Sequence, residues 1–140
     1  MLKSIDPVLT GTLLKALDEM GHGDRIAIVD RNYPSLSAGP QVVHLGEISI
    51  VRAAEAIFSV LPLDSFIDNP LLRMEADDQS PASPTHEKVL DTARKHHLRP
   101  LEFALIPRQD FYVAATQCLL IVQCLETAPY SCFIGQKGVV

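Results

Sequence analysis

Apolar residues recur at helical spacing in several stretches of the chain. This spacing predicts helices over residues 10–20, 49–61, 85–98 and 108–116. Thr10 and Ser49 can cap the first two helices, because their hydroxyl oxygens can accept hydrogen bonds from free N–H groups of the first turn. Gly21 and Pro62 follow the same two helices, and glycine and proline commonly end a helix.

Continuous apolar runs between these segments predict strands over residues 25–30, 41–45, 101–106, 118–125 and 131–135. The run 118–125 is too uniformly apolar for a strand with one face in water, so it is predicted to be central in a sheet, with 131–135 pairing near it. Helices that alternate with strands favour an α/β domain, or an α+β domain, with one central sheet flanked by helices. The 140 residues allow one domain, over 1–140, in which 77–84 is a surface loop.

Charge and hydropathy exclude several classes of protein. Lys and Arg number 12 against 17 Asp and Glu, for a net charge of −5, and no basic stripe is present to neutralise phosphates. We therefore expect neither nucleic acid nor an anionic membrane as a partner. The longest uncharged stretch, 111–125, is shorter than the roughly 20 apolar residues of a membrane span. The first residues also lack the apolar core of a secretory signal, so we expect a cytoplasmic protein.

The last third of the chain is unusually poor in charge. Between residues 111 and 140 only Glu126 and Lys137 are formally charged. An interior strand and a protected terminal hairpin would account for this pattern. Contact with neighbouring subunits is the alternative that we favour, because a small domain buries only about 68–70% of its unfolded surface. The sequence therefore predicts a homo-oligomer.

No motif for a metal, nucleotide or redox cofactor is present. Cys118, Cys124 and Cys132 lack the paired spacing of a zinc site and are predicted to be reduced, buried thiols. His96 and His97 are neighbours near the end of a predicted helix, where they are expected to be solvated rather than metal ligands. Any reaction must then rely on acid–base groups alone, without a cofactor.

His22 is the first candidate for such a group, since it lies between Gly21 and Gly23 where a helix ends and a strand begins. An imidazole can exchange a proton near neutral pH, as a general acid or base must. The alternative is a helix that ends at glycine and leaves an exposed loop histidine.

Asp30 closes the apolar strand 25–30. Ligands of α/β sheets gather beyond the carboxyl ends of strands, so this carboxylate is well placed to accept hydrogen bonds from a polar ligand. An Asx turn within its own loop is an equally good interpretation.

Two further segments combine polar and aromatic groups. Arg108 precedes Phe111 and Tyr112, and a guanidinium beside aromatic rings suits a polyhydroxylated ligand, although an ion pair with a core Phe and a surface Tyr would explain the same pattern. The turn 126–132 carries several hydroxyls into the last strand, and turn chemistry alone would explain it.

In their order along the chain, these segments resemble the ribose pyranase and fucose mutarotase family of sugar-anomer isomerases. The resemblance covers nearly the whole chain and is closer to the fucose branch. It rests on Ile5-Asp6-Pro7, Met20-Gly21-His22-Gly23-Asp24, Asp30 with Asn32-Tyr33-Pro34, Pro62-Leu63-Asp64, Arg108 with Phe111-Tyr112, Glu126-Thr127, Tyr130 and Lys137-Gly138-Val139. The chain departs from the family at Cys132, where Asn is usual, and at Thr116-Gln117, where a Lys-rich stretch is usual.

The resemblance implies a central mixed sheet and a ring-shaped homo-oligomer, a decamer of two pentamers with sugar pockets between subunits. It implies a mutarotase that interconverts the anomers of a fucose-like or ribose-like aldose. The implied residues are His22 for catalysis, Asp30, Arg108, Tyr130, Ser131 and Cys132 for substrate binding, with Tyr112 as a further candidate. A non-catalytic monosaccharide-binding protein of the same fold is the alternative.

The spacing of His22 and Asp30 favours a pocket shared between subunits. Eight residues separate them across a predicted strand, or roughly 26 Å at about 3.3 Å per residue. Either the turn at Gly21 and Gly23 folds His22 back, or the histidine of one subunit meets the aspartate of its neighbour. We favour the second arrangement.

Overall fold

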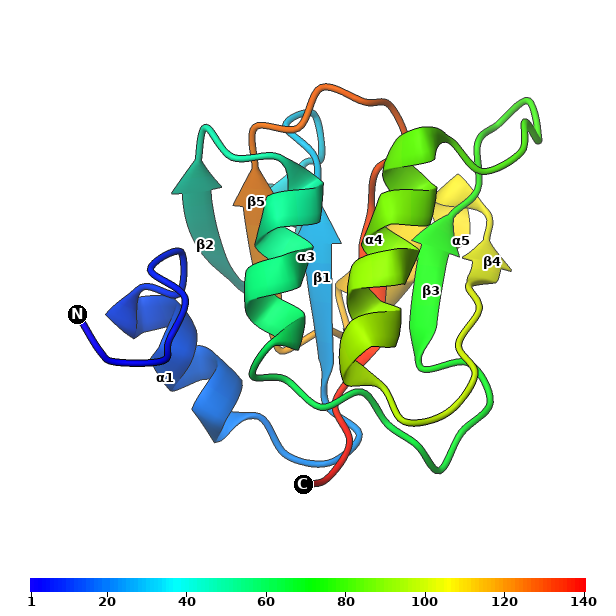
Figure 1. Cartoon of the computed structure of the whole chain (residues 1–140). Helices are drawn as coiled ribbons and strands as arrows, with labels where there is room; N and C mark the ends of the chain where they lie inside the picture. The colour runs from blue at the N-terminus through cyan, green and yellow to red at the C-terminus, as the bar shows by residue number, and fades with distance from the viewer.

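The computed structural model describes residues 1–140 and contains one six-stranded sheet in the order β2-β5-β1-β6-β3-β4 (Figure 1). The strands are β1 (Arg25–Val29), β2 (Gln41–Gly46), β3 (Leu71–Met74), β4 (Ala104–Ile106), β5 (Leu120–Cys124) and β6 (Phe133–Gln136). The helices are α1 (Gly11–Glu19), α2 (Ser35–Ala38), α3 (Ile50–Phe58), α4 (Pro84–His96) and α5 (Arg108–Ala115). The predicted α/β domain with one central sheet is confirmed.

The sheet is mixed, because β6 runs against its neighbours. β1, β5 and β2 pair in parallel, β3 pairs in parallel with β4, and β6 lies antiparallel between β1 and β3. The carboxyl ends of five strands and the amino end of β6 therefore meet at one edge of the sheet. We call this the carboxyl edge, and the opposite one the amino edge.

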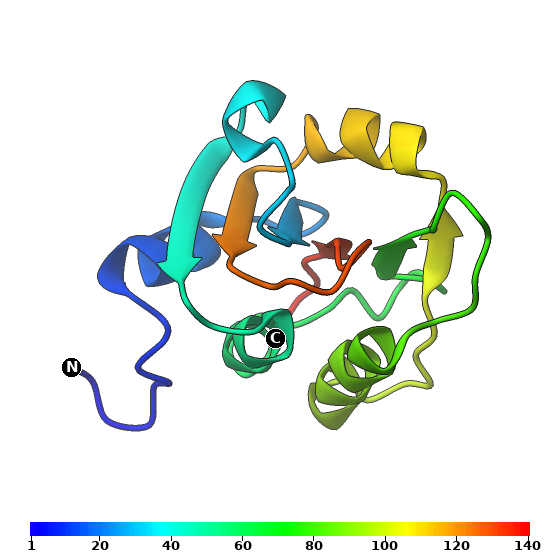
Figure 2. The ribbon, with the colours of Figure 1, turned by 90° about the horizontal axis from the view of Figure 1, so that it is seen from above.

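Helices cover both faces of the sheet. Figure 2 shows α3 and α4 on one face and α2 and α5 on the other, with α1 beside β2. Strand side chains alternate accordingly: Ile26 and Ile28 belong to the core under α3 and α4, whereas Ala27 and Val29 belong to the smaller core under α5. Both faces of β1 are thus buried, as its uniformly apolar sequence requires.

The predicted helix starts agree with the observed caps. The hydroxyl of Thr10 accepts a hydrogen bond from the Leu13 N–H, and that of Ser49 accepts one from the Arg52 N–H. Helix α4 starts one residue earlier than predicted, at Pro84, because Ser83 caps it and fixes its first turn.

Two predictions about strands need correction. Strand β3 was not predicted, because its Arg73 interrupts a short apolar run that only tertiary packing makes extended. Strand β4 is confined to residues 104–106 of the predicted 101–106. The predicted pairing of 131–135 near 118–125 is met one strand away, because β1 lies between β5 and β6, and the terminal hairpin of the alternative interpretation does not form.

The charge-poor segment 111–140 is accounted for largely within one chain. Both β5 and β6 are interior strands, and most of their side chains are buried. Exposed apolar side chains remain in this segment at Val113, Leu119, Leu125 and the two terminal valines. None of the five helices combines the length and the apolar character that a membrane crossing requires.

Candidate active site

A pocket of about 280 Å³ opens at the carboxyl edge of the sheet. Its walls come from the loop that follows β1, from the last residue of β3, from α5 and from the loop that enters β6. The lining residues are Asp30, Asn32, Tyr33, Met74, Arg108, Tyr112, Pro129, Tyr130 and Cys132. The structure therefore brings together Asp30, Arg108, Tyr112, Tyr130 and Cys132, which the sequence singled out from three separate segments.

Asp30 follows directly after β1 and is 6% exposed. Its Oδ1 accepts a hydrogen bond of 3.0 Å from the Asn32 N–H, so the Asx turn exists alongside the place in the pocket. Burial raises the pKa of the Asp30 carboxyl above its ordinary value. Hydrogen bonds from Asn32, Cys132 and the Ser131 N–H lower this pKa but do not outweigh burial. Asp30 is thus a desolvated acceptor held ready for a ligand hydroxyl.

Arg108 stands on the first turn of α5. Its Nε donates to both carboxylate oxygens of Asp77 at 3.0 Å, and its guanidinium lies 5.6 Å from the centre of the Tyr112 ring. The hydrogen bonds to Asp77, and then to Tyr112, raise the pKa of Arg108. Phe111 is buried in the core and Arg108 forms an ion pair with Asp77, so the core Phe and the ion pair of the alternative interpretation are also present. The pairing with Asp77 holds the guanidinium in place at the wall of the pocket.

Tyr130 also lines the pocket, in a left-handed backbone conformation with φ of 56°. Its carbonyl oxygen lies 3.0 Å from Nε2 of His86, whose Nδ1 accepts the Ser83 N–H. Nε2 of His86 must therefore donate to the Tyr130 carbonyl. Burial lowers the pKa of His86, which favours the neutral ring. Sequence reasoning did not single out His86, because its partner at the pocket, the Tyr130 carbonyl, lies 44 residues away.

Ser131 and Cys132 follow Tyr130 and are both buried. Ser131 does not line the pocket, and its hydroxyl has no hydrogen-bond partner in the chain. Cys132 does line it, and burial raises the pKa of its thiol well above the ordinary value. The thiol therefore stays protonated, as a donor to Asp30 rather than a nucleophile. All three cysteines are free, as predicted.

His22 lies at the amino edge of the sheet, away from this pocket. Three features hold the turn around His22. The Gly21 N–H donates a hydrogen bond to the Asp24 carboxylate, Gly23 adopts a left-handed conformation with φ of 89°, and the backbone of the turn forms hydrogen bonds with Lys137. Strand β1 separates His22 from Asp30 with five residues, or roughly 16 Å at 3.3 Å per residue. The turn does not fold His22 back to Asp30.

The surroundings of His22 contain two residues that sequence reasoning left without a role. Its Nε2 lies 3.1 Å from Oδ2 of the buried Asp64, and its ring packs against Phe66 with 5.6 Å between the ring centres. The His22 side chain is 47% exposed and that of Phe66 is also exposed. Asp64 lies 42 residues from His22, so no local spacing could reveal this pair.

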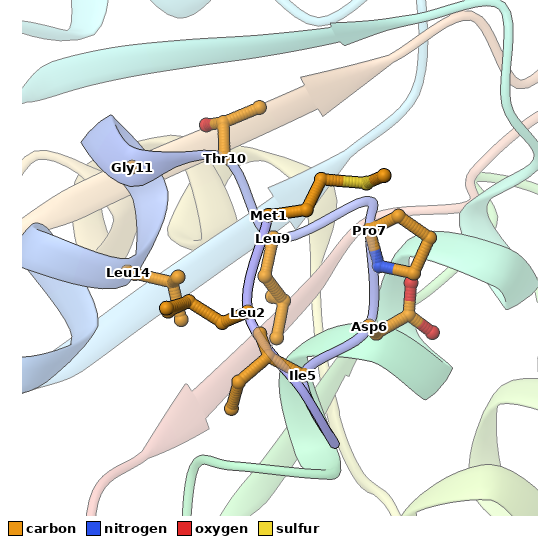
Figure 3. A pocket seen from close by; sticks show the side chains of 9 residues that line it. All are labelled: Met1, Leu2, Ile5, Asp6, Pro7, Leu9, Thr10, Gly11 and Leu14. Carbon is orange, nitrogen blue, oxygen red and sulfur yellow. The ribbon is translucent and has the colours of Figure 1, made fainter.

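A larger cavity of about 540 Å³ lies at the N-terminal segment and α1 (Figure 3). Its walls are mainly aliphatic side chains, such as those of Leu2, Ile5 and Leu14. The one carboxylate there, Asp6, is held by Arg52 at 2.6 and 2.7 Å. It offers no free acid–base group, so the pocket at the carboxyl edge is the better candidate site.

The raised pKa of Asp30 makes a prediction about stability. The native state holds the Asp30 proton more tightly than the unfolded chain does. The contribution of Asp30 to the free energy of unfolding is therefore most favourable below the ordinary pKa of 3.8 and is lost as pH rises through the native pKa. The free energy of unfolding of wild type, minus that of Asp30→Asn, should thus fall between acidic and neutral buffer. Denaturant titrations at the two pH values measure this difference in the free energy of unfolding. A difference that rises with pH would contradict the prediction.

The fold and this pocket define a small α/β protein with a compact, partly polar pocket at the carboxyl edge of its sheet. Residues 3–140 match the RbsD / FucU transport protein family, and the chain belongs to this family.

Comparisons with individual proteins agree with this assignment. The chain is 36% identical over 147 aligned positions to the L-fucose mutarotase of Haemophilus influenzae, covering 99% of this chain and 97% of that one. A fucose mutarotase from Streptococcus pneumoniae, solved in complex with L-fucose, superimposes with a TM-score of 0.90 at 30% identity and 99% coverage of both chains. Bacillus subtilis RbsD, solved with D-ribose, shares the fold at a TM-score of 0.79 and 18% identity, over 100% of this chain and 99% of that one.

Proposed function

We propose that the protein is a mutarotase that interconverts the anomers of an aldose of the fucose or ribose type. The observation that carries this proposal is the pocket at the carboxyl edge, where a desolvated carboxylate, a guanidinium and tyrosines converge in about 280 Å³. This combination suits a monosaccharide, whose hydroxyls need donors and acceptors and whose C–H face packs on aromatic rings. The fucose and ribose complexes of the two structural relatives support the same ligand class.

Asp30 and Arg108 act as hydroxyl clamps in this proposal, with Tyr130 and Tyr112 as ring or hydroxyl contacts. Cys132 lines the pocket, where its thiol supports the Asp30 carboxyl. The thiol does not make the hydrogen bonds that the side-chain amide of the family's usual asparagine would make at this position. An unpaired buried polar group costs about 1–3 kcal/mol, so this position should influence which sugar hydroxyls are accepted. Ser131 contributes its backbone N–H to Asp30.

His22 reaches the sugar from a neighbouring copy of the chain in this proposal. Within one chain, His22 and the pocket lie at opposite edges of the sheet, too far apart for one monosaccharide. The half-exposed imidazole and the exposed Phe66 beside it form a surface suited to closing another subunit's pocket. A head-to-tail contact of this kind repeats into a ring, in line with a homodecamer. Cytoplasmic residence also stays a prediction.

The reaction needs only proton transfers. The imidazole takes the proton of the anomeric hydroxyl, C1 gains a carbonyl bond, the bond from C1 to the ring oxygen breaks, and the ring oxygen receives a proton. The open aldehyde then rotates and closes on its other face by the reverse steps. Ring opening already occurs in water, and a positioned acid–base group adds about 10²–10⁴-fold.

Magnetisation-exchange NMR tests the function directly. Added protein should accelerate exchange between the α and β anomer signals of one or more aldoses in a panel that includes L-fucose and D-ribose. Unchanged exchange for every sugar that binds would instead support a non-catalytic monosaccharide-binding protein. The unusual Cys132 in the pocket is the observation that keeps this second function open.

A further inference from the structure

The buried carboxylate of Asp64 lies directly behind His22. Its Oδ2 is 3.1 Å from Nε2 of His22, while the His22 side chain is 47% exposed and that of Asp64 only 2%. One edge of the imidazole is therefore anchored inside the chain and the other faces outward. Asp64 belongs to no pocket wall at the carboxyl edge and has no part in the sugar contacts described above.

A chain of oriented hydrogen bonds fixes the state of this carboxylate. The Phe66 N–H donates to Oδ1 at 2.9 Å, and Nε2 of Gln136 donates to Oδ2 at 3.0 Å. Gln136 cannot turn its amide around, because its Oε1 accepts from Nε of Arg25 at 3.2 Å and a guanidinium has no acceptor. The bond from Phe66 does most to hold the pKa of Asp64 below its ordinary value; burial opposes it, while Gln136 and His22 add to it.

An ionised carboxylate can only accept hydrogen bonds, so Nε2 of His22 must carry a hydrogen. We propose that Asp64 is a positioning residue that holds the neutral imidazole of His22 in the Nε2–H tautomer, which makes Nδ1 the proton-transferring atom. This inference rests on the proposed function of His22. It goes further in assigning the atom that reacts and the residue that selects it.

The assignment constrains the reaction. With Nε2 occupied by Asp64, Nδ1 alone takes the proton from the anomeric hydroxyl and gives it to the ring oxygen as the bond between C1 and that oxygen breaks. Both sugar oxygens are bonded to C1, so one nitrogen can serve both in turn. The imidazolium formed between the two transfers is stabilised by the carboxylate of Asp64, as in other Asp–His pairs.

Asp64→Asn should reverse the tautomer. The Phe66 N–H is a fixed donor, so the asparagine oxygen must face it and the asparagine NH₂ must face His22 and Gln136. Gln136 is held by Arg25, whereas His22 can respond by accepting at Nε2 and moving its hydrogen to Nδ1. An Nδ1–H ring cannot take a proton from the sugar.

Two measurements test this inference. In wild type, ¹⁵N NMR of the neutral His22 ring should show the hydrogen on Nε2; a hydrogen on Nδ1 would overturn the proposal without any variant. In Asp64→Asn, the hydrogen should move to Nδ1, and kcat for anomer exchange should fall at least about tenfold with KM little changed. Asp68→Asn, an exposed carboxylate on the same loop, is the matched control and should retain the wild-type tautomer and rate.

Failure of this inference can be told apart from failure of the proposed function. If wild type accelerates exchange and Asp64→Asn does so equally well, Asp64 has no positioning role and the mutarotase proposal stands. If wild type accelerates no exchange, the mutarotase proposal fails, and the ¹⁵N spectrum still decides whether Asp64 selects the tautomer.

Discussion

His22→Gln is expected to reduce protein-catalysed anomer exchange to the rate in buffer alone, a loss of about 10²–10⁴-fold. Glutamine can still donate a hydrogen bond to Asp64 through Nε2, but its amide cannot take up and release a proton near neutral pH. Magnetisation-exchange NMR at a saturating sugar concentration measures the loss. Sugar binding, followed by calorimetry, should persist because Asp30 and Arg108 are untouched.

His96→Gln is the matched control, since it makes the same change at an exposed histidine at the end of α4. It should exchange anomers at the wild-type rate. Circular dichroism should show both variants folded, because His22 makes its contacts at a half-exposed surface turn. Wild-type exchange by His22→Gln would reject the histidine as the proton-transfer group.

Gly138→Ala is expected to lower the free energy of unfolding by about 1–3 kcal/mol. An added Cβ at Gly138 would lie 2.7 Å from Cα of Asp64 and 2.8 Å from the carbonyl oxygen of Leu63. Both are backbone atoms, which cannot move aside as the end of a flexible side chain could. The C-terminal segment must therefore move away from the loop that carries Asp64. Denaturant unfolding measures the stability loss, and a slower anomer exchange should accompany it because the support of His22 is displaced.

Gly11→Ala provides the control for this substitution. Gly11 starts α1, and a Cβ there would meet nothing within 4 Å. Alanine favours a helix over glycine by up to about 1 kcal/mol, so this variant should be unchanged or more stable. Equal stabilities of the Gly138 and Gly11 variants would contradict the close packing of the C-terminal segment on Leu63 and Asp64.

The sequence predicted most of the fold where apolar spacing and caps agree. Thr10 and Ser49 located the starts of α1 and α3, and the uniform run around β5 indicated an interior strand. Strand β3 was not predicted because its four residues include Arg73, and only its place beside β6 makes the segment extended. The insertion of β1 between β5 and β6 is a long-range property that no local pattern encodes.

The pocket was predictable for a simple topological reason. Asp30 follows a buried strand, Tyr130 lies on a loop and Arg108 begins α5, and all three are at the carboxyl edge, where the carboxyl ends of the parallel strands meet. The support of His22 was not predictable, because Asp64 and Gln136 come from segments 42 and 114 residues away. Such pairs become visible only in the folded structure, where these distant segments lie side by side.

Mixing two inactive variants tests the shared site most directly. Chains with His22→Gln retain the Asp30 pocket, and chains with Asp30→Asn retain His22, so neither variant alone should exchange anomers. Refolded together in equal amounts, they should recover about a quarter of wild-type activity, since in a head-to-tail ring one contact in four joins an intact histidine to an intact pocket. A mixture as inactive as its two components, although the chains co-assemble, would contradict a site built from two subunits.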